Sequence, residues 1–166
     1  MKTYQKKSVA GFSMIEMLIA IIVLSVGLIG IAALQARGQQ FNYVAYVRTQ
    51  ASFLAYDIMD RMRLNQKAHS GDTGIDIKST YLNQVSSARS AAADVGSLEP
   101  NCDRSPCSYQ QLAQYDLASW FKALQDNLPD GDAEIKKEGD SLRIIVKWAE
   151  SRDPSAQLTT QEWVYQ

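Results

Sequence analysis

The sequence has few of the residues that several kinds of chemistry need. There are two cysteines, Cys102 and Cys107, and one histidine, His69, which is a thin inventory for metal or redox chemistry. The formal net charge is −1, so no strong basic field points to a nucleic acid partner. There is no phosphate-binding glycine loop, no acid pair with defined spacing and no basic patch interleaved with aromatics. We therefore expect no catalytic residue, no cofactor and no metal site.

The informative part is a long apolar run near the N-terminus. From Phe12 to Leu34 the only ionisable side chain is Glu16. As a helix rising about 1.5 Å per residue, this stretch would span roughly 34 Å, enough to cross a bilayer core. Three lysines and no acid precede it: Lys2, Lys6 and Lys7. This charge bias predicts a cytoplasmic N-terminus.

Three interpretations of this segment compete. A secretory signal peptide has a shorter apolar region followed by small residues, whereas here the small residues lie before Phe12. A plain signal anchor fits the length and the charge, but it leaves Gly11 and Glu16 unexplained. An unpaired carboxylate in hydrocarbon costs several kcal/mol, so Glu16 needs a reason. The third interpretation accounts for every piece: a basic leader ends in Gly11, an aromatic follows, and an acid stands at the fifth position after the glycine.

The stretch Gly11-Phe12-Ser13-Met14-Ile15-Glu16, followed by Met17 to Leu24, resembles the class III signal of type IV pilins and pseudopilins. The resemblance implies cleavage between Gly11 and Phe12 by the prepilin peptidase on the cytoplasmic face. It also implies N-methylation of Phe12. The sequence departs from many members in one respect, since Ser8 to Ala10 separate the last lysine from Gly11.

In such a filament, Glu16 would set the register between subunits. Cleavage creates a positive amine at Phe12, which Glu16 of a neighbouring subunit can meet inside an apolar core. The pair adds little net stability, because desolvation offsets the attraction, but a shifted subunit leaves a charge unpaired. In the alternative interpretation, Glu16 favours the dipole at the helix start and reaches the lipid headgroups.

Small residues interrupt the middle of the apolar helix. Gly27 and Gly30 each cost roughly 1 kcal/mol relative to alanine in a helix interior. In pilins this region can become extended in the filament, and many carry a proline where this sequence has Ala32-Ala33. Two alternatives stay open: local melting, and close helix packing through small residues.

The helix is predicted to continue past Arg37 and to end near Asn65. Apolar residues recur at threes and fours along one face: Phe41, Val44, Val47, Ala51, Leu54, Ile58 and Met62. Asp57 and Arg61 are four apart and form a helix-surface pair. The apolar face needs a partner, which the rest of the chain should supply.

After the long helix, residues 66–78 are interpreted as a loop, and weak helical spacing follows from Thr80 to Val95. If the membrane segment places this region in the periplasm, an oxidising compartment, Cys102 and Cys107 are expected to form a disulfide.

The final third of the chain predicts one helix and three strands. Ser108 to Gln111 has the form of a capping box that starts a helix, and Pro129 ends it. The apolar stripe of this helix comprises Leu117, Phe121, Leu124 and Leu128. After a turn at residues 130–132, strands are expected at 133–137, 142–148 and 158–165. Three antiparallel strands would cover the amphipathic face of the long helix, which makes the fold class α+β.

This order of elements is similar to the pilin fold, and more closely to the PilV group of type IV pilus minor pilins. The residues that carry the closer resemblance are Gly11 to Leu28, the helix end Asp57-Ile58-Met59-Asp60-Arg61-Met62-Arg63, Cys107, Tyr115-Asp116-Leu117, Trp120 and Val146-Lys147-Trp148. The resemblance implies four parts: a class III leader (1–11), a transmembrane and assembly half of the long helix (12–36), its amphipathic half (37–65) and a periplasmic globular domain (66–166).

The implied role is a minor pilin, not an enzyme, that helps to nucleate the pilus at the inner membrane and ends near its tip. The implied partners are other minor pilins, the major pilin, a tip adhesin, the prepilin peptidase and inner membrane lipid before assembly. Two alternatives stay open: a minor pseudopilin of a type II secretion system, and a signal-anchored periplasmic enzyme or binding protein.

Overall fold

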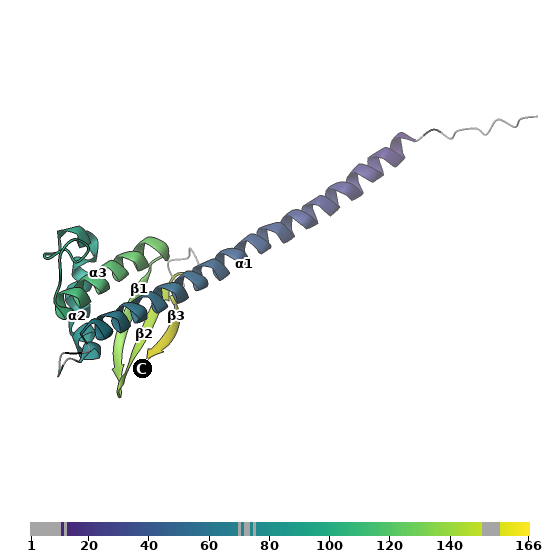
Figure 1. Cartoon of the computed structure of the whole chain (residues 1–166). Helices are drawn as coiled ribbons and strands as arrows, with labels where there is room; N and C mark the ends of the chain where they lie inside the picture. Colours follow the sequence, from purple (N-terminus) through teal and green to yellow (C-terminus); the bar gives the residue numbers. More distant parts are fainter. Residues whose placement is uncertain (1–10, 12, 70, 72–73, 75, 151–156) are drawn as a thin grey trace, which may run out of the picture. The chain divides into compact units, whose positions relative to one another are not determined.

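The computed structural model describes residues 11, 13–69, 71, 74, 76–150 and 157–166 (Figure 1). Its elements in chain order are α1 (Met14–Ala68), α2 (Ile77–Ala91), the 3-10 helix η1 (Ala92–Ser97), α3 (Tyr109–Asn127), β1 (Asp132–Glu138), β2 (Ser141–Trp148) and β3 (Thr159–Tyr165). The predicted α+β class is confirmed. The chain divides into two compact units, with the division between Tyr43 and Val44 inside α1.

The second unit is built around a three-stranded antiparallel sheet in the order β1-β2-β3. Ile144 of the central strand stands opposite Ile135 on one side and Trp163 on the other. The buried face of this sheet and the C-terminal half of α1 share one core. From α1 the core takes Val47, Ala51, Ala55, Ile58, Met59 and Met62. Apart from the adjacent pair Ile58 and Met59, these positions recur at threes and fours. Of the predicted stripe, Val47, Ala51, Ile58 and Met62 are buried, and Val44 and Leu54 are half-buried. The prediction was wrong for Phe41, which is 73% exposed.

Helix α3 lies in the same core and begins as predicted. Ser108 accepts a hydrogen bond from the Gln111 backbone, and the Gln111 side chain accepts one from the Ser108 backbone, so the capping box is formed. The stripe Leu117, Phe121, Leu124 and Leu128 is buried throughout. Trp120, also fully buried, donates its indole N–H to the Leu54 carbonyl of α1 at 2.7 Å.

The turn between α3 and β1 requires a glycine. A Cβ at Gly131 would lie 2.2 Å from the Leu124 carbonyl oxygen, so no other residue fits there without a backbone shift. Gly139, with φ +61°, occupies the short turn between β1 and β2. The two glycines thus lie in the turns immediately before and after β1.

Two helix boundaries differ from the prediction. Helix α1 ends at Ala68 instead of near Asn65, and α2 begins at Ile77 instead of Thr80. Asn65 is buried, and its side chain donates to the Tyr109 carbonyl at 3.0 Å, so a tertiary contact holds the last turns of α1. Asp76 caps α2 by accepting from the Ser79 N–H at 3.2 Å. The connection is therefore shorter than the predicted loop.

Candidate functional site

The first unit presents an apolar helix surface. Every large apolar side chain from Met14 to Leu34 is between 54% and 90% exposed. Soluble monomers rarely expose contiguous apolar patches of this extent. Among the described residues, α1 is also the one helix long and apolar enough to cross a membrane, judged by length and composition. Lipid or neighbouring apolar helices would satisfy this surface.

Glu16 lies in the first turn of α1. Its backbone N–H donates to the Ser13 carbonyl at 3.1 Å, and the acid is the third residue of the helix. Among the described residues, no cation lies within ion-pair distance of its carboxylate. The carboxylate is thus the one charged group in an otherwise apolar helical surface, at the N-terminal end where the helix dipole favours it.

The predicted processing site falls at the edge of the described chain. Gly11 is exposed, and no heavy atom of the described residues outside its immediate neighbours lies within 4 Å of a Cβ built there. Packing therefore does not require a glycine at this position, and its role in peptidase recognition stays a prediction. Phe12 and residues 1–10, with the predicted leader and its three lysines, lie outside the described residues.

The small residues in the middle of the apolar segment lie in continuous helix. Ser25 donates its hydroxyl to the Ile21 carbonyl at 2.7 Å, four residues earlier. A Cβ added at Gly27 or Gly30 would meet no atom of the structurally described part of the chain within 4 Å. Local melting and close packing against a neighbouring helix both remain predictions.

A buried polar cluster joins the three helices of the second unit. Asp116 of α3 is 6% exposed, and it accepts from the Tyr81 hydroxyl of α2 at 2.6 Å and from Arg61 of α1 at 3.3 Å. Arg61 also donates to Asp57 at 3.0 Å, which confirms the predicted helix-surface pair. Asn65 donates to the Tyr81 oxygen at 3.4 Å. This cluster ties α1 to α2 and α3.

Burial dominates the electrostatics of the cluster. It raises the pKa of the Asp116 carboxyl above its ordinary value, even though the hydrogen bonds from Tyr81 and Arg61 favour ionisation. Burial also raises the pKa of Tyr81, and the neighbouring Asp116 carboxylate adds to this effect. Asp116 accepts from both Tyr81 and Arg61, so the cluster connects the helices as a structural joint.

Sequence reasoning missed this cluster, although one signal for it was present. Asp116 stands three residues after Ala113 and four before Trp120, so an acid lies on the same face of α3 as these two apolar residues. An acid on a buried helix face needs a cation or several donors. The partners Arg61 and Tyr81 are distant in sequence, at 55 and 35 residues, and only the folded chain brings them together.

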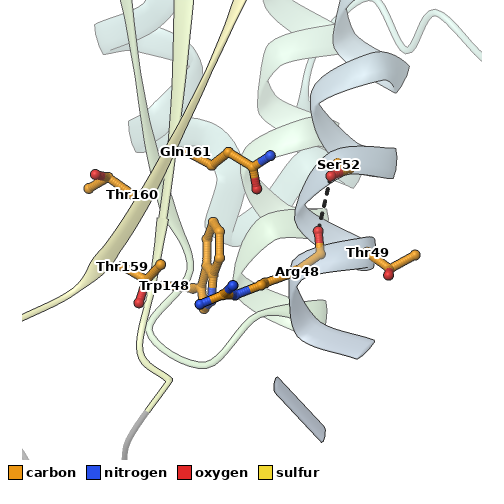
Figure 2. A pocket seen from close by; sticks show the side chains of 7 residues that line it. All are labelled: Arg48, Thr49, Ser52, Trp148, Thr159, Thr160 and Gln161. Carbon is orange, nitrogen blue, oxygen red and sulfur yellow. Dashed lines mark hydrogen bonds between the residues drawn. The ribbon is translucent and has the colours of Figure 1, made fainter. Parts of the chain in front are cut away.

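A hollow lies between α1 and the beginning of β3 (Figure 2). Its lining residues are Arg48, Thr49, Ser52, Trp148, Thr159, Thr160 and Gln161. Figure 2 shows the Gln161 side chain reaching from β3 toward α1. Arg48 forms a bidentate ion pair with Glu150, in which Nε donates to Oε1 at 2.7 Å and Nη2 donates to Oε2 at 3.2 Å. The hydrogen bond from Arg48 lowers the pKa of the Glu150 carboxyl.

The two cysteines form a disulfide within the second unit. Cys102 and Cys107 are bonded, with their Cα atoms 5.6 Å apart. Asp103, inside this small loop, accepts a hydrogen bond from the Tyr115 hydroxyl of α3. The loop is therefore attached to α3 as well as closed on itself. Among the described residues, no group of three or more histidine, cysteine or acidic side chains has a geometry that could hold a metal ion.

Comparison with protein families matches residues 6–32 to the prokaryotic N-terminal methylation motif. The match covers the end of the leader with Lys6 and Lys7, then Gly11, Phe12, Glu16 and most of the apolar segment. It indicates a signal of the type IV pilin or pseudopilin kind, and it leaves the second unit unassigned. Comparisons with curated proteins and with solved structures give no match.

Proposed function

We propose that this chain is a subunit of a pilin-like filament, and specifically a minor pilin of a type IV pilus, similar to the PilV group. The observation that carries the proposal is the methylation motif on an exposed apolar helix with a single acid. The α+β second unit on the same helix fits a subunit that is anchored first in the inner membrane and then in a filament. The role that we propose is structural and not enzymatic.

Processing would create the partner that Glu16 needs. The prepilin peptidase hydrolyses the bond between Gly11 and Phe12. The new amine of Phe12 is positively charged both before and after its methylation. In a bundle of apolar helices, this amine of one subunit meets the Glu16 carboxylate of another. Because an unpaired charge in an apolar surrounding costs several kcal/mol, only the register that pairs them is accepted.

The proposed partners are other minor pilins, the major pilin and a tip adhesin, with the prepilin peptidase and inner membrane lipid acting before assembly. The topology is a single pass with the N-terminus in the cytoplasm and the second unit in the periplasm, followed by transfer to the pilus. The disulfide between Cys102 and Cys107 fits this oxidising compartment.

N-terminal mass spectrometry of the protein from its native host tests the proposal. A chain beginning with N-methylated Phe12 is expected. An intact Met1 would exclude a pilin and favour the signal-anchored periplasmic protein.

A deletion strain then separates the minor pilin from the minor pseudopilin of a type II secretion system, since both share the signal. Loss of surface pili with normal secretion of exoproteins is expected. The reverse pattern would assign the chain to secretion.

A further inference from the structure

The two edges of the sheet differ in composition. Five of the seven residues of β1 are charged, namely Asp132, Glu134, Lys136, Lys137 and Glu138. β3 has the same length and one charged residue, Glu162. Charges on an edge strand oppose the addition of a foreign strand, and natural sheets use them for that purpose. The β1 edge has this protection, and the β3 edge lacks it.

The two edges also differ in what covers them. Arg89 of α2 donates to the Ala133 carbonyl of β1 and pairs with Asp132, and both α2 and α3 lie close to β1. β3 is at the other end of the sheet order, and within the described ranges no strand pairs with its outer edge. Alternate N–H and C=O groups along β3 therefore face away from β2 without a ladder partner.

The hollow between α1 and β3 continues this free edge. Thr159 and Gln161 line it, and they stand opposite Trp148 and Val146, which are buried on the inner face of β2. A strand added beside β3 would direct alternate side chains to this same inner face, toward the polar groups of Thr49 and Ser52 on α1. The strand edge and the helix together form a groove of the kind that binds extended peptides.

We propose that the β3 edge binds an extended segment of a different protein, which adds to the sheet as a fourth strand. The half-buried Trp163 favours an apolar side chain beside it, and the polar hollow at Gln161 favours a polar one. On the outer face, Glu162 is 48% exposed and has Arg143 at 2.6 Å on one oxygen, so it favours a cation on its open side. The proposal does not depend on the filament role.

A second copy of β3 fits this edge poorly. Antiparallel pairing of two β3 strands over all seven residues would place Glu162 opposite Glu162. Like charges directly opposite one another destabilise a strand pair. The sequence of β3 therefore disfavours self-pairing and favours a partner with a cation at that position.

Hydrogen exchange of the full chain in detergent micelles tests the proposal. The probe is a peptide of alternating threonine and valine with one lysine. We expect it to slow exchange of β3 amides about tenfold or more at saturation, and to leave β1 amides unchanged. The matched control is the same peptide with alternate amides N-methylated, which cannot form main-chain bonds and should protect nothing. Absence of β3 protection, or equal protection of β1 and β3, would overturn the proposal.

Variants then locate the contact. Val164→Lys, at a side chain that is 51% exposed, should weaken peptide binding several-fold, whereas Leu64→Lys on α1, at 67% exposed, should not. Glu162→Lys should prefer a peptide that carries glutamate in place of lysine. Unchanged binding by both β3 variants would refute the assignment to this edge. If protection of the β3 amides rises with protein concentration in the absence of peptide, the added strand comes from a second copy of this chain, and the proposal of a foreign strand is wrong.

Discussion

Replacing Asp116 tests whether the buried cluster holds the helices of the second unit together. Two variants separate its contributions. Asp116→Ala removes the acceptor of the Tyr81 hydroxyl, whereas Asp116→Asn keeps an acceptor oxygen of nearly the same shape and removes the charge. If the joint depends on the hydrogen bond, the alanine variant should be clearly the less stable of the two.

The expected magnitudes follow from burial. Tyr81 is fully buried, and an orphaned buried hydroxyl costs about 1–3 kcal/mol. The Arg61 side chain is 36% exposed and keeps its ion pair with Asp57, so the loss of its contact with Asp116 lowers the stability little. With the lost packing atoms, Asp116→Ala should lower the free energy of unfolding by about 2–3 kcal/mol. Asp116→Asn should lower it by about 1 kcal/mol or less.

The effect of Asp116 should depend on pH with a defined sign. Burial raises its pKa in the folded protein, so the folded chain holds the proton more tightly than the unfolded chain, where the pKa is about 3.9. The stability that comes from this site is complete below the unfolded pKa and is lost as pH rises through the raised value. The free energy of unfolding of the wild type should therefore exceed that of Asp116→Asn most at low pH, and this difference should become smaller as pH rises.

Denaturant unfolding of the full chain in detergent, followed by tryptophan fluorescence, measures these differences. Trp120 and Trp148 are fully buried, so their emission reports loss of the core. Tyr81→Phe is the matched control and completes a double-mutant cycle with Asp116→Asn. Two results would refute the reasoning. One is an equal loss of unfolding free energy in Asp116→Ala and Asp116→Asn, and the other is a difference between wild type and Asp116→Asn that grows as pH rises.

Further predictions concern processing, assembly and stability. Gly11→Asp should block cleavage, so that mass spectrometry finds the uncut chain. Glu16→Val should be cleaved normally but incorporated poorly; normal incorporation at native expression, measured in sheared pili, would remove the register argument. Replacing Cys102 and Cys107 by serine should lower the unfolding free energy by about 2 kcal/mol, because the closed loop is small; no change under oxidising conditions would contradict this. Trp120→Phe should cost more than about 1 kcal/mol in the same assay, because it removes the bond to the α1 backbone and leaves a cavity at a fully buried site, and a neutral result would show that this bond is dispensable.

Local signals predicted much of the fold. Ser108 and Gln111 are three apart, so a capping box can be read without knowing what the helix contacts. The alternation of Leu142, Ile144 and Val146 likewise predicted the central strand, because side chains of a strand alternate between its faces. The end of α1 was misjudged, since Asn65 looks like a helix terminator in sequence and is instead buried by a contact with Tyr109.

The apolar run from Phe12 to Leu34 by itself determined the most specific statement about this protein. Its signal is local and can be recognised without knowledge of any tertiary contact. It consists of a glycine, an aromatic residue, an acid and a helix that is apolar on every face. Only the tertiary structure decided that Asp116 is a joint between three helices and that β3 is the open edge of the sheet. The Asp116 cluster and the position of β3 both depend on contacts between residues far apart in the chain. Hydrophobic periodicity predicts which face of an element is buried, but it does not predict which other element covers that face.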